Sequence, residues 1–468
     1  MNRISRRALM GASAAAMAAA AVLKPDFTRG ANALGPLDAV GIAAALRHKQ
    51  TTPLEVVDAA ISRIELVNPK LNAVVTEFFE KARARAKEKL PDGPLAGAPY
   101  LIKDLNDVKG ERTTDGSRLM AKNIATANGT MTEKALAAGM IILGKTNTPE
   151  FGLMASTESV LLGPCRNPWN TDYSTGGSSG GAAAAVASGM VPAAHGSDGG
   201  GSIRIPASCC GTFGLKPSTG RMRLAEMERQ PAGISVENCE TRTVRDSATI
   251  LALSEDTSAD APLKPIGFVS GPSKQRLKIA FSIIGDNGRQ PHPDVKAAVE
   301  ATAKLCGGLG HDIIPAKSPV DGERFADAFL TVWASGAADL VGLAKQMKQK
   351  PEDVFEPWTL GLAEFYAKKP KGALAKSLAY FRVVEQQVAD FFAHYDAWLT
   401  PVLSGPPPRL GEQAPTVPFP TLYDRIVGYA AYTPVHNTAG TPAMSVPLGM
   451  SANGLPIGSQ FAAAKGNE

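Results

Sequence analysis

Cysteine and long apolar runs are scarce in this sequence, and each scarcity excludes a class of protein. The five cysteines, of which only Cys209 and Cys210 are adjacent, form neither a disulfide framework nor paired CxxC ligands for zinc. We expect mostly buried thiols, with one disulfide left open. Beyond the N-terminal 33 residues, no segment reaches the roughly 20 uninterrupted apolar residues that span a bilayer. Stable membrane insertion is therefore not expected.

An excess of charge of one sign is also lacking. The formal net charge is +5, but residues 1–33 contain five basic residues and one acidic residue, so the remainder is close to neutral. This balance gives no reason to expect a nucleic-acid partner. With 44% hydrophobic and 20% charged residues, the chain has the composition of a globular protein. About 435 residues outside the N-terminal segment are enough for one large domain or two ordinary ones.

The N-terminus carries the features of a removable export signal. Arg6 and Arg7 precede an alanine-rich apolar run that ends near Leu23, and Ala31-Asn32-Ala33 offers a small-residue cleavage site. This order is typical of a twin-arginine signal, predicted here over residues 1–33. A disordered basic tail is the alternative. We expect a periplasmic or secreted protein formed by residues 34–468.

The rest of the chain has the pattern of helices and strands that is typical of an α/β enzyme. Thr51 and Thr52 before Pro53 predict a capped helix start. Residues 96–102 form a short apolar run that predicts a buried strand ending at Lys103. The other expected elements are helices at 37–46, 53–67, 182–188 and 293–305, strands at 140–143, 277–281 and 398–401, a helix-rich segment at 321–392 and a proline-rich loop at 406–420.

Two glycine clusters that contain serine are the most informative feature. Gly176 to Gly181 and Gly199 to Ser202 are joined by a stretch of small residues. Glycine lets backbone N–H groups approach a reacting atom closely, and each cluster also supplies a hydroxyl. A flexible linker is disfavoured because the clusters are embedded in apolar runs. A phosphate-binding loop is excluded because no Gly-Lys-Ser/Thr closes either cluster.

Four motifs that occur in order connect these clusters to a known family. They are PYLIKD with Lys103, GGSSGG with Ser178, DGGGSIRIP with Ser202, and CGTFGLKP after Cys210. The pattern resembles the amidase signature hydrolases, from about Leu37 to the C-terminus. The resemblance implies a single α/β domain with a mixed, twisted central sheet covered by helices on both faces. It also implies a Ser-cisSer-Lys triad without metal or organic cofactor, in which Ser202 is the nucleophile, Ser178 the bridging serine after a cis bond from Gly177, and Lys103 the base.

The chemistry of amide hydrolysis agrees with these roles. Lysine acts as a base only when its neutral form is populated, and burial lowers its pKa toward neutrality. The bridging serine would pass the nucleophile's proton to Lys103, and the reverse relay would protonate the leaving amine. Gly199, Gly200 and Gly201 are the expected oxyanion hole, since consecutive N–H groups without side chains can turn inward. The family usually has Thr or Ile at the position of Gly199.

Other residues near the motifs have expected supporting roles. We expect Asp198 and Arg204 to hold the nucleophile loop by an ion pair rather than to perform chemistry. Gly177 and Ser179 are expected to support the site, and His195 is interpreted as a loop or core histidine because no GxSxG elbow accompanies it. Four aromatic residues could either line a substrate pocket or pack helices, the second being slightly favoured: Trp333, Trp358, Tyr366 and Tyr380.

The predicted function is hydrolysis of a carboxylic amide through an acyl-enzyme, with a small-molecule amide and water as substrates. RNPW at 166–169 and SIRIPAS at 202–208 resemble hydrolases of small linear or cyclic amides, including nylon-oligomer (6-aminohexanoate cyclic dimer) hydrolases. Relatives also cleave aryl amides, esters and carbamates. The alternatives are a catalytically impaired, exported binding protein on the same scaffold and an amidotransferase-type glutaminase subunit. A homodimer stays open. The chain ends at Glu468, where the family continues into a helix, so we expect a truncated C-terminus.

Overall fold

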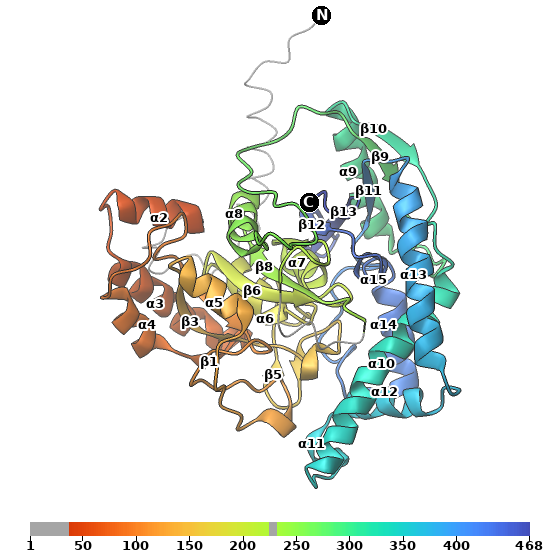
Figure 1. Ribbon diagram of the computed structural model, residues 1–468, viewed down its shortest axis with the longest axis horizontal. Coiled ribbons are helices and arrows are strands. Elements are labelled where there is room, and N and C mark those ends of the chain that lie inside the picture. Colours follow the sequence, from red (N-terminus) through yellow and green to blue (C-terminus); the bar gives the residue numbers. More distant parts are fainter. Residues whose placement is uncertain (1–36, 224–231) are drawn as a thin grey trace, which may run out of the picture.

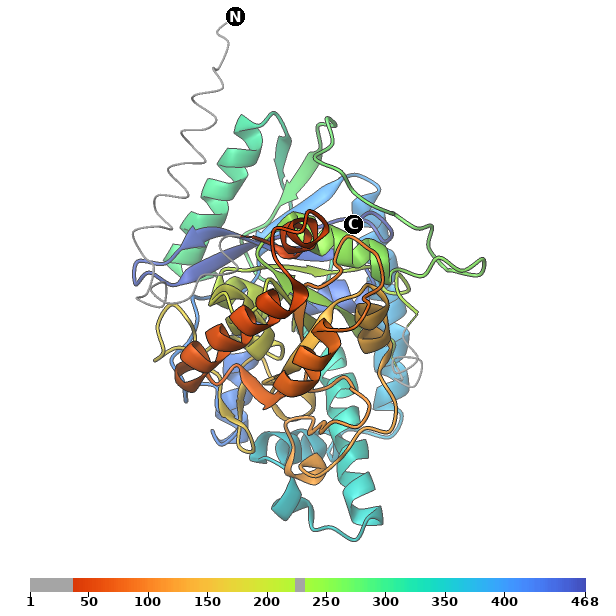
Figure 2. The ribbon, with the colours of Figure 1, turned by 90° about the vertical axis from the view of Figure 1, so that its left-hand side faces the viewer.

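The computed structural model describes residues 37–223 and 232–468. The predicted export signal, residues 1–33, lies outside the described residues. Among the helices that are described, none has the length and apolar character needed to cross a bilayer. Figures 1 and 2 show a twisted sheet that runs through the molecule, with helices packed along it.

The sheet has eleven strands in the order β1-β3-β2-β6-β8-β7-β12-β13-β11-β9-β10. It is mixed, because β2 pairs in parallel with β3 and β6, whereas β8 pairs antiparallel with β6 and β7. A separate two-stranded sheet joins β4 and β5. The strands are β1 (Val74–Glu77), β2 (Pro99–Lys103), β3 (Ile141–Thr146), β4 (Glu158–Ser159), β5 (Gly163–Pro164), β6 (Ala193–Asp198), β7 (Phe213–Lys216), β8 (Val236–Thr241), β9 (Lys278–Phe281), β10 (Asp312–Pro315), β11 (Ala397–Pro401), β12 (Ala443–Met450) and β13 (Pro456–Ala462).

The helices follow the predicted order closely. They are α2 (Ala39–Arg47), α3 (Pro53–Leu71), α4 (Phe79–Ala86), η2 (Arg118–Met120), α5 (Thr130–Ala137), η3 (Glu150–Gly152), α6 (Gly180–Ala187), α7 (Arg204–Cys210), α8 (Val244–Ser254), α9 (Pro293–Gly308), α10 (Gly322–Gln346), α11 (Pro351–Val354), α12 (Pro357–Ala367), α13 (Ala373–Phe392), α14 (Phe419–Tyr429) and α15 (Pro434–Thr438). The predicted cap of α3 is confirmed, since Thr52 accepts from the Glu55 N–H and Glu55 accepts from the Thr52 N–H.

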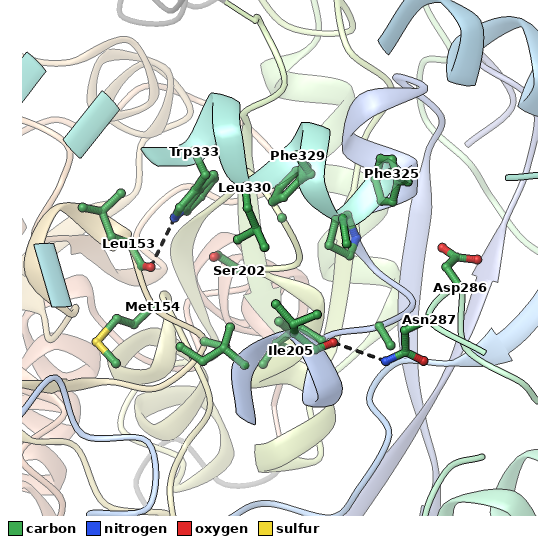
Figure 3. A pocket seen from close by; sticks show the side chains of 18 of the residues that line it. Leu153, Met154, Ser202, Ile205, Asp286, Asn287, Phe325, Phe329, Leu330 and Trp333 are labelled. Carbon is green, nitrogen blue, oxygen red and sulfur yellow. Dashed lines mark hydrogen bonds between the residues drawn. The ribbon is translucent and has the colours of Figure 1, made fainter. Parts of the chain in front are cut away.

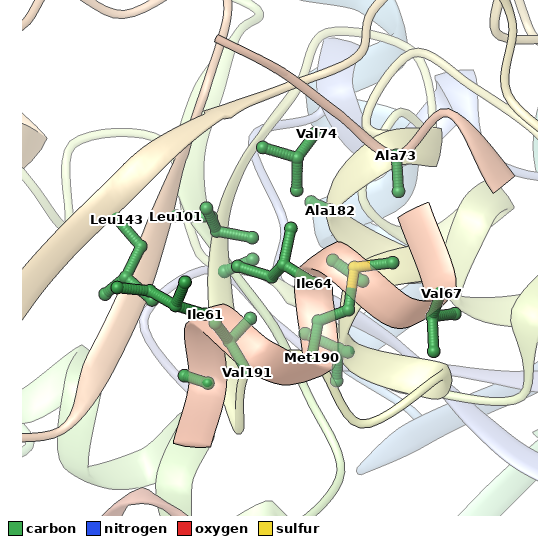
Figure 4. Close-up of a cluster of buried hydrophobic side chains, with 14 of the residues drawn as sticks. Ile61, Ile64, Val67, Ala73, Val74, Leu101, Leu143, Ala182, Met190 and Val191 are labelled. Atoms are coloured by element: carbon green, nitrogen blue, oxygen red, sulfur yellow. The ribbon is translucent and has the colours of Figure 1, made fainter. Parts of the chain in front are cut away.

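Helices cover both faces of the sheet, as expected. Successive residues of β2 point to opposite faces. Leu101 packs with Ile64 and Leu143 in a core formed with α3, α4 and α6 (Figure 4). Tyr100 and Ile102 pack in a second core with α2, α5 and α8. In the C-terminal half, α10 and α13 lie over one face of the sheet and α9 over the other.

The small-residue helix α6 begins two residues earlier than its predicted start at 182. Its first residues are Gly180 and Gly181, and a Cβ on Gly181 would lie 2.3 Å from the Asn147 backbone nitrogen. The helix can begin there only because these positions carry no side chain. Its remaining alanines are buried against the sheet, so the segment that carries Ser178 is held directly beside the central strands.

The cysteines are all free thiols, and all five are buried. The prediction of buried thiols is confirmed, and the disulfide that the sequence left open does not form.

Candidate active site

Lys103 is the last residue of β2, and the fold buries it completely. The strand has parallel neighbours on both sides, and each of its five residues is buried. The Lys103 Nζ atom lies 2.6 Å from Ser178 Oγ, 2.9 Å from Ser179 Oγ and 3.0 Å from Ser197 Oγ. All three of these partners are neutral hydroxyl groups. Among the described residues no carboxylate lies within ion-pair distance of this amine.

This environment makes the neutral amine of Lys103 accessible. Burial lowers the pKa of Lys103 from 10.5 to about 7, and more distant Asp198, Glu237 and Glu240 oppose the shift. Burial disfavours the ammonium form because the low-dielectric interior does not replace its hydration, and hydroxyl groups carry no compensating charge. The free amine of Lys103 is therefore well populated near neutral pH, unlike that of an ordinary lysine.

Ser178 lies in the turn before α6, close against the loop around Ser156. The peptide bond between Gly177 and Ser178 is cis, as the resemblance implied. A Cβ on Gly177 would lie 2.4 Å from the Ser156 carbonyl oxygen, so this position requires glycine. Ser178 itself is only 2% exposed. The close packing fixes the Ser178 hydroxyl on the amine of Lys103.

Ser202 lies on the loop between β6 and α7, and this loop meets the turn before α6. The Ser202 carbonyl oxygen accepts a hydrogen bond of 3.1 Å from the Ser179 N–H. Ser202 lines a pocket between η3, α10 and α14. The structure therefore brings Lys103 and Ser178 into direct contact and ties Ser202 to the residue after Ser178. Within the described chain, no hydrogen bond joins the Ser202 hydroxyl to Ser178.

The loop that carries Ser202 is held by a buried ion pair. Arg204 Nη2 lies 2.9 Å from Asp198 Oδ1, and both side chains are fully buried. Burial alone would raise the pKa of Asp198, but Arg204 outweighs it and holds that pKa well below its usual range. Asp198 also accepts from the N–H groups of Gly201, at 2.7 Å, and Ile203, at 3.1 Å. The geometry agrees with the expected structural role of this pair.

Contacts from the C-terminal half complete the network around Arg204. Its Nη1 atom donates to the Thr433 carbonyl oxygen at 2.9 Å and to Gln460 Oε1 at 2.8 Å. Its Nη2 atom donates to Asn437 Oδ1 at 2.6 Å. The sequence analysis missed these partners, because nothing in their own surroundings marks them as neighbours of the glycine cluster.

The three glycines of the predicted oxyanion hole differ in their hydrogen bonds. The Gly201 N–H is already used by Asp198. The N–H groups of Gly199 and Gly200 donate to no described residue, and Gly200 lines the pocket with Ser202. A Cβ on Gly199 would lie 2.7 Å from Ser235 Oγ and 3.1 Å from the Trp333 ring. Trp333 therefore fills the space that a larger residue at position 199 would need.

His195 is a core residue of β6, as interpreted from the sequence. Its Nδ1 atom accepts from the Lys103 backbone N–H at 3.3 Å, so its proton is on Nε2, which lies 3.6 Å from Glu237 Oε2. His195 is fully buried. Its contacts lie with the Lys103 backbone and Glu237 rather than with Ser202. Ser197, two residues further on, is the contact of Lys103 that the sequence analysis missed.

The pocket beside Ser202 is lined almost wholly by apolar surface (Figure 3). Trp333 and Trp358 line it, and the indole N–H of each donates to the Leu153 carbonyl oxygen, at 3.3 Å and 3.0 Å. These two residues therefore both pack helices and form the pocket wall. Tyr380 instead belongs to the core between α10 and α13, and Tyr366 packs at the edge of the cluster around Trp358.

Comparisons of the whole chain with known proteins show its fold and its family. The solved structure of 6-aminohexanoate cyclic dimer hydrolase complexed with substrate superimposes with a TM-score of 0.84 at 31% identity, covering 92% of this chain and 94% of that one. The fold is thus that of an amide hydrolase. The family model Amidase matches residues 55–468. This chain belongs to that family, the amidase signature enzymes, and is an amide-hydrolysing enzyme.

Two relatives show how far the similarity extends. AmiC of Mycobacterium leprae (strain TN) is 42% identical over 442 residues, which cover 94% of each protein. The 6-aminohexanoate-cyclic-dimer hydrolase of Pseudomonas sp. (strain NK87) is 34% identical over 462 residues, which cover 92% of each. Both alignments span nearly the whole chain.

Proposed function

We propose that the protein hydrolyses amides through an acyl-enzyme on Ser202, with Ser178 as the bridging serine and Lys103 as the base. Neutral Lys103 takes the proton of Ser178 while Ser178 takes the proton of Ser202, and the Ser202 oxygen forms a bond to the amide carbon. The carbonyl electron pair moves to oxygen, where the N–H groups of Gly199 and Gly200 stabilise the charge.

The reverse relay completes the first half of the reaction. The proton returns through Ser178 to the amide nitrogen, the C–N bond breaks, and the amine leaves. Water then attacks the ester carbon while its proton follows the same path to Lys103. Collapse releases the carboxylic acid and restores Ser202. The relay is balanced because one proton moves out and back in each half.

The observation that carries this proposal is the 2.6 Å contact between the buried amine of Lys103 and Ser178 Oγ. Its support is the lowered pKa of Lys103, about 7, which gives a base at neutral pH. The Ser202 hydroxyl faces the pocket where a substrate carbonyl would lie. The relay requires the Ser202 hydroxyl to reach Ser178, and catalytic hydrogen bonds often tighten only when substrate is bound.

The test compares three triad variants with a matched neighbour. Lys103→Ala, Ser178→Ala and Ser202→Ala should each lower kcat for an anilide by at least about 100-fold. Ser197→Ala also removes a hydroxyl from Lys103 but lies outside the relay, so its loss should be much smaller. A fluorophosphonate should label the wild type and not the Ser202→Ala variant. Undiminished turnover in the Lys103 variant would remove the base assignment.

The same probe separates the alternatives. An impaired binding protein would not be labelled at Ser202 and would not turn over any amide. We propose that the substrates are small linear, cyclic or aryl amides, with esters and carbamates as further candidates, because the pocket beside Ser202 is lined mostly by apolar side chains. A panel of these compounds, with glutamine as the substrate of a glutaminase, ranks the classes by kcat/KM.

We also propose that residues 1–33 direct export through the twin-arginine pathway and that the remainder forms one domain. The support for the second statement is the single eleven-stranded sheet, to which both described stretches contribute strands. Fusion of residues 1–33 to a reporter tests the first. The paired Lys substitution of Arg6 and Arg7 should keep the reporter in the cytoplasm, whereas unchanged export would contradict the proposal.

A further inference from the structure

One acidic side chain lies in the apolar pocket without a charged partner. Asp286 belongs to the loop that follows β9, and it lines the pocket beside the start of α10. Its Oδ2 atom is shielded from solvent and has no hydrogen-bond partner among the described residues. No ion pair in the described chain involves it. An unsatisfied buried oxygen is costly, which suggests that a ligand satisfies it.

Ser202 and Asp286 occupy different parts of the same pocket. In Figure 3, Asp286 lies at one end, Leu153 and Met154 lie toward the other, and Ser202 is between them. The rings of Phe325 and Phe329 line the wall that leads from Ser202 toward Asp286. A substrate whose amide lies at Ser202 would therefore extend along an apolar wall before it reaches the carboxylate.

We propose that Asp286 is a specificity-determining residue that binds the ammonium group of substrates in which an apolar chain separates a primary amine from the scissile amide. This proposal rests on the proposed reaction at Ser202. The other end of the pocket, near Leu153 and Met154, takes the apolar half of the same substrate.

The surroundings of Asp286 favour a cation over other ligands. Burial raises the pKa of Asp286 to about 6, and the hydroxyl of Ser318 opposes the rise, so the carboxylate is mostly ionised at neutral pH. Neighbouring Tyr432 does not neutralise it. Burial first, and Asp286 second, raise the pKa of this phenol well above its usual range, and its hydroxyl donates to the Ile283 carbonyl oxygen. Arg289, three residues away, pairs with exposed Asp424 instead.

Two other ligand classes fit the pocket less well. Asp286 is the only acidic residue among those described as lining the pocket, so a hard metal ion would lack the several oxygen ligands that it requires. An anionic substrate would be repelled. The amide of Asn287 donates to the Val427 carbonyl oxygen at 3.4 Å, which leaves Asp286 as the charged contact at this end.

The experiment uses matched substrates and one isosteric variant. Para-nitroanilides of ω-aminoalkanoic acids are compared with alkanoyl anilides of equal chain length, and N-(ω-aminoalkyl)benzamides with N-alkylbenzamides. The ammonium should raise kcat/KM in one of the two series by about 10- to 100-fold, the range of a charge-assisted contact. Asp286→Asn should abolish that preference and leave the alkyl substrates nearly unchanged. Asp424→Asn, an exposed acid, is the control.

The alkyl substrates also separate this inference from the proposed reaction. Their turnover requires the Ser202 site but not Asp286, so its absence in the wild type would contradict the reaction itself. Turnover without any preference for the ammonium, or a preference that Asp286→Asn retains, would overturn the role of Asp286. If the variant does not fold, inhibition of the wild-type enzyme tests the proposal instead. Alkylamines should inhibit more strongly than alkanols of equal length, and equal inhibition would overturn the proposal.

Discussion

Replacing Lys103 with methionine should change how the stability of the protein depends on pH. The pKa of Lys103 is about 7 in the fold, whereas an unfolded chain gives lysine a pKa of about 10.4. Between these values the unfolded chain holds a proton that the folded protein lacks. The free energy of unfolding therefore rises with pH across this window.

The magnitude follows from the size of the pKa difference. One bound proton gives a slope of about 1.4 kcal/mol per pH unit, and the whole window corresponds to about 5 kcal/mol. That is the order of the cost of burying the charged lysine below pH 7. Methionine fills a similar volume without a charge. The lost hydrogen bonds to the three serines add an offset that does not depend on pH, so the slope isolates the charge.

The assay is urea unfolding of the wild type and Lys103→Met at several pH values between about 7.5 and 9.5, well inside the window. The difference in unfolding free energy between the two proteins should change by about 1.4 kcal/mol per pH unit, in favour of the wild type as pH rises. Lys304→Met, at an exposed position of α9, is the control and should run parallel to the wild type. Parallel curves for Lys103→Met as well would refute the claim that folding neutralises this amine.

Two further predictions concern catalysis. Because only neutral Lys103 acts as a base, kcat/KM should rise with pH through about 7 and then level off, and a pH-rate profile that falls over this range would contradict the mechanism. Gly201→Ala should lower kcat/KM by at least about tenfold, since Gly201 has φ of +130° and an added Cβ would lie 2.4 Å from Thr433 Oγ1. Gly308→Ala, where an added Cβ meets nothing within 4 Å, should leave activity unchanged, and equal effects of the two substitutions would refute this reasoning.

Features of the molecule that depend on local sequence patterns could be predicted from the sequence. Apolar runs and turn residues predicted several of the strands and helices. The ordered motifs predicted that Lys103 and Ser178 lie together. The sequence analysis gave no expectation for β8, whose letters VENCET include two glutamates. All six residues are buried, because Glu237 accepts from Asn106 and Glu240 accepts from Thr212 in contacts between distant segments.

The pocket was beyond the reach of sequence patterns for the same reason. Asp286 is a single acid in a loop with no motif around it, and it shares a pocket with Ser202 only because the chain folds so that both line it together with residues of α10 and α14. For the aromatic residues the sequence left a choice between packing helices and lining a pocket, and Trp333 and Trp358 do both. Gly199 is a further example. The family usually has a larger residue at this position, and the reason for glycine here is that the Trp333 ring occupies the space that a side chain would need.

The links from Arg204 to Thr433, Asn437 and Gln460 have a consequence for biosynthesis. The loop that carries Ser202 is held through Arg204 by groups that the ribosome adds more than 200 residues later. A nascent chain that has emerged only as far as α9 holds all three proposed catalytic residues but cannot lock the nucleophile in place. We therefore expect the proposed hydrolysis to begin only after the last strands, β12 and β13, have been made and have joined the middle of the sheet.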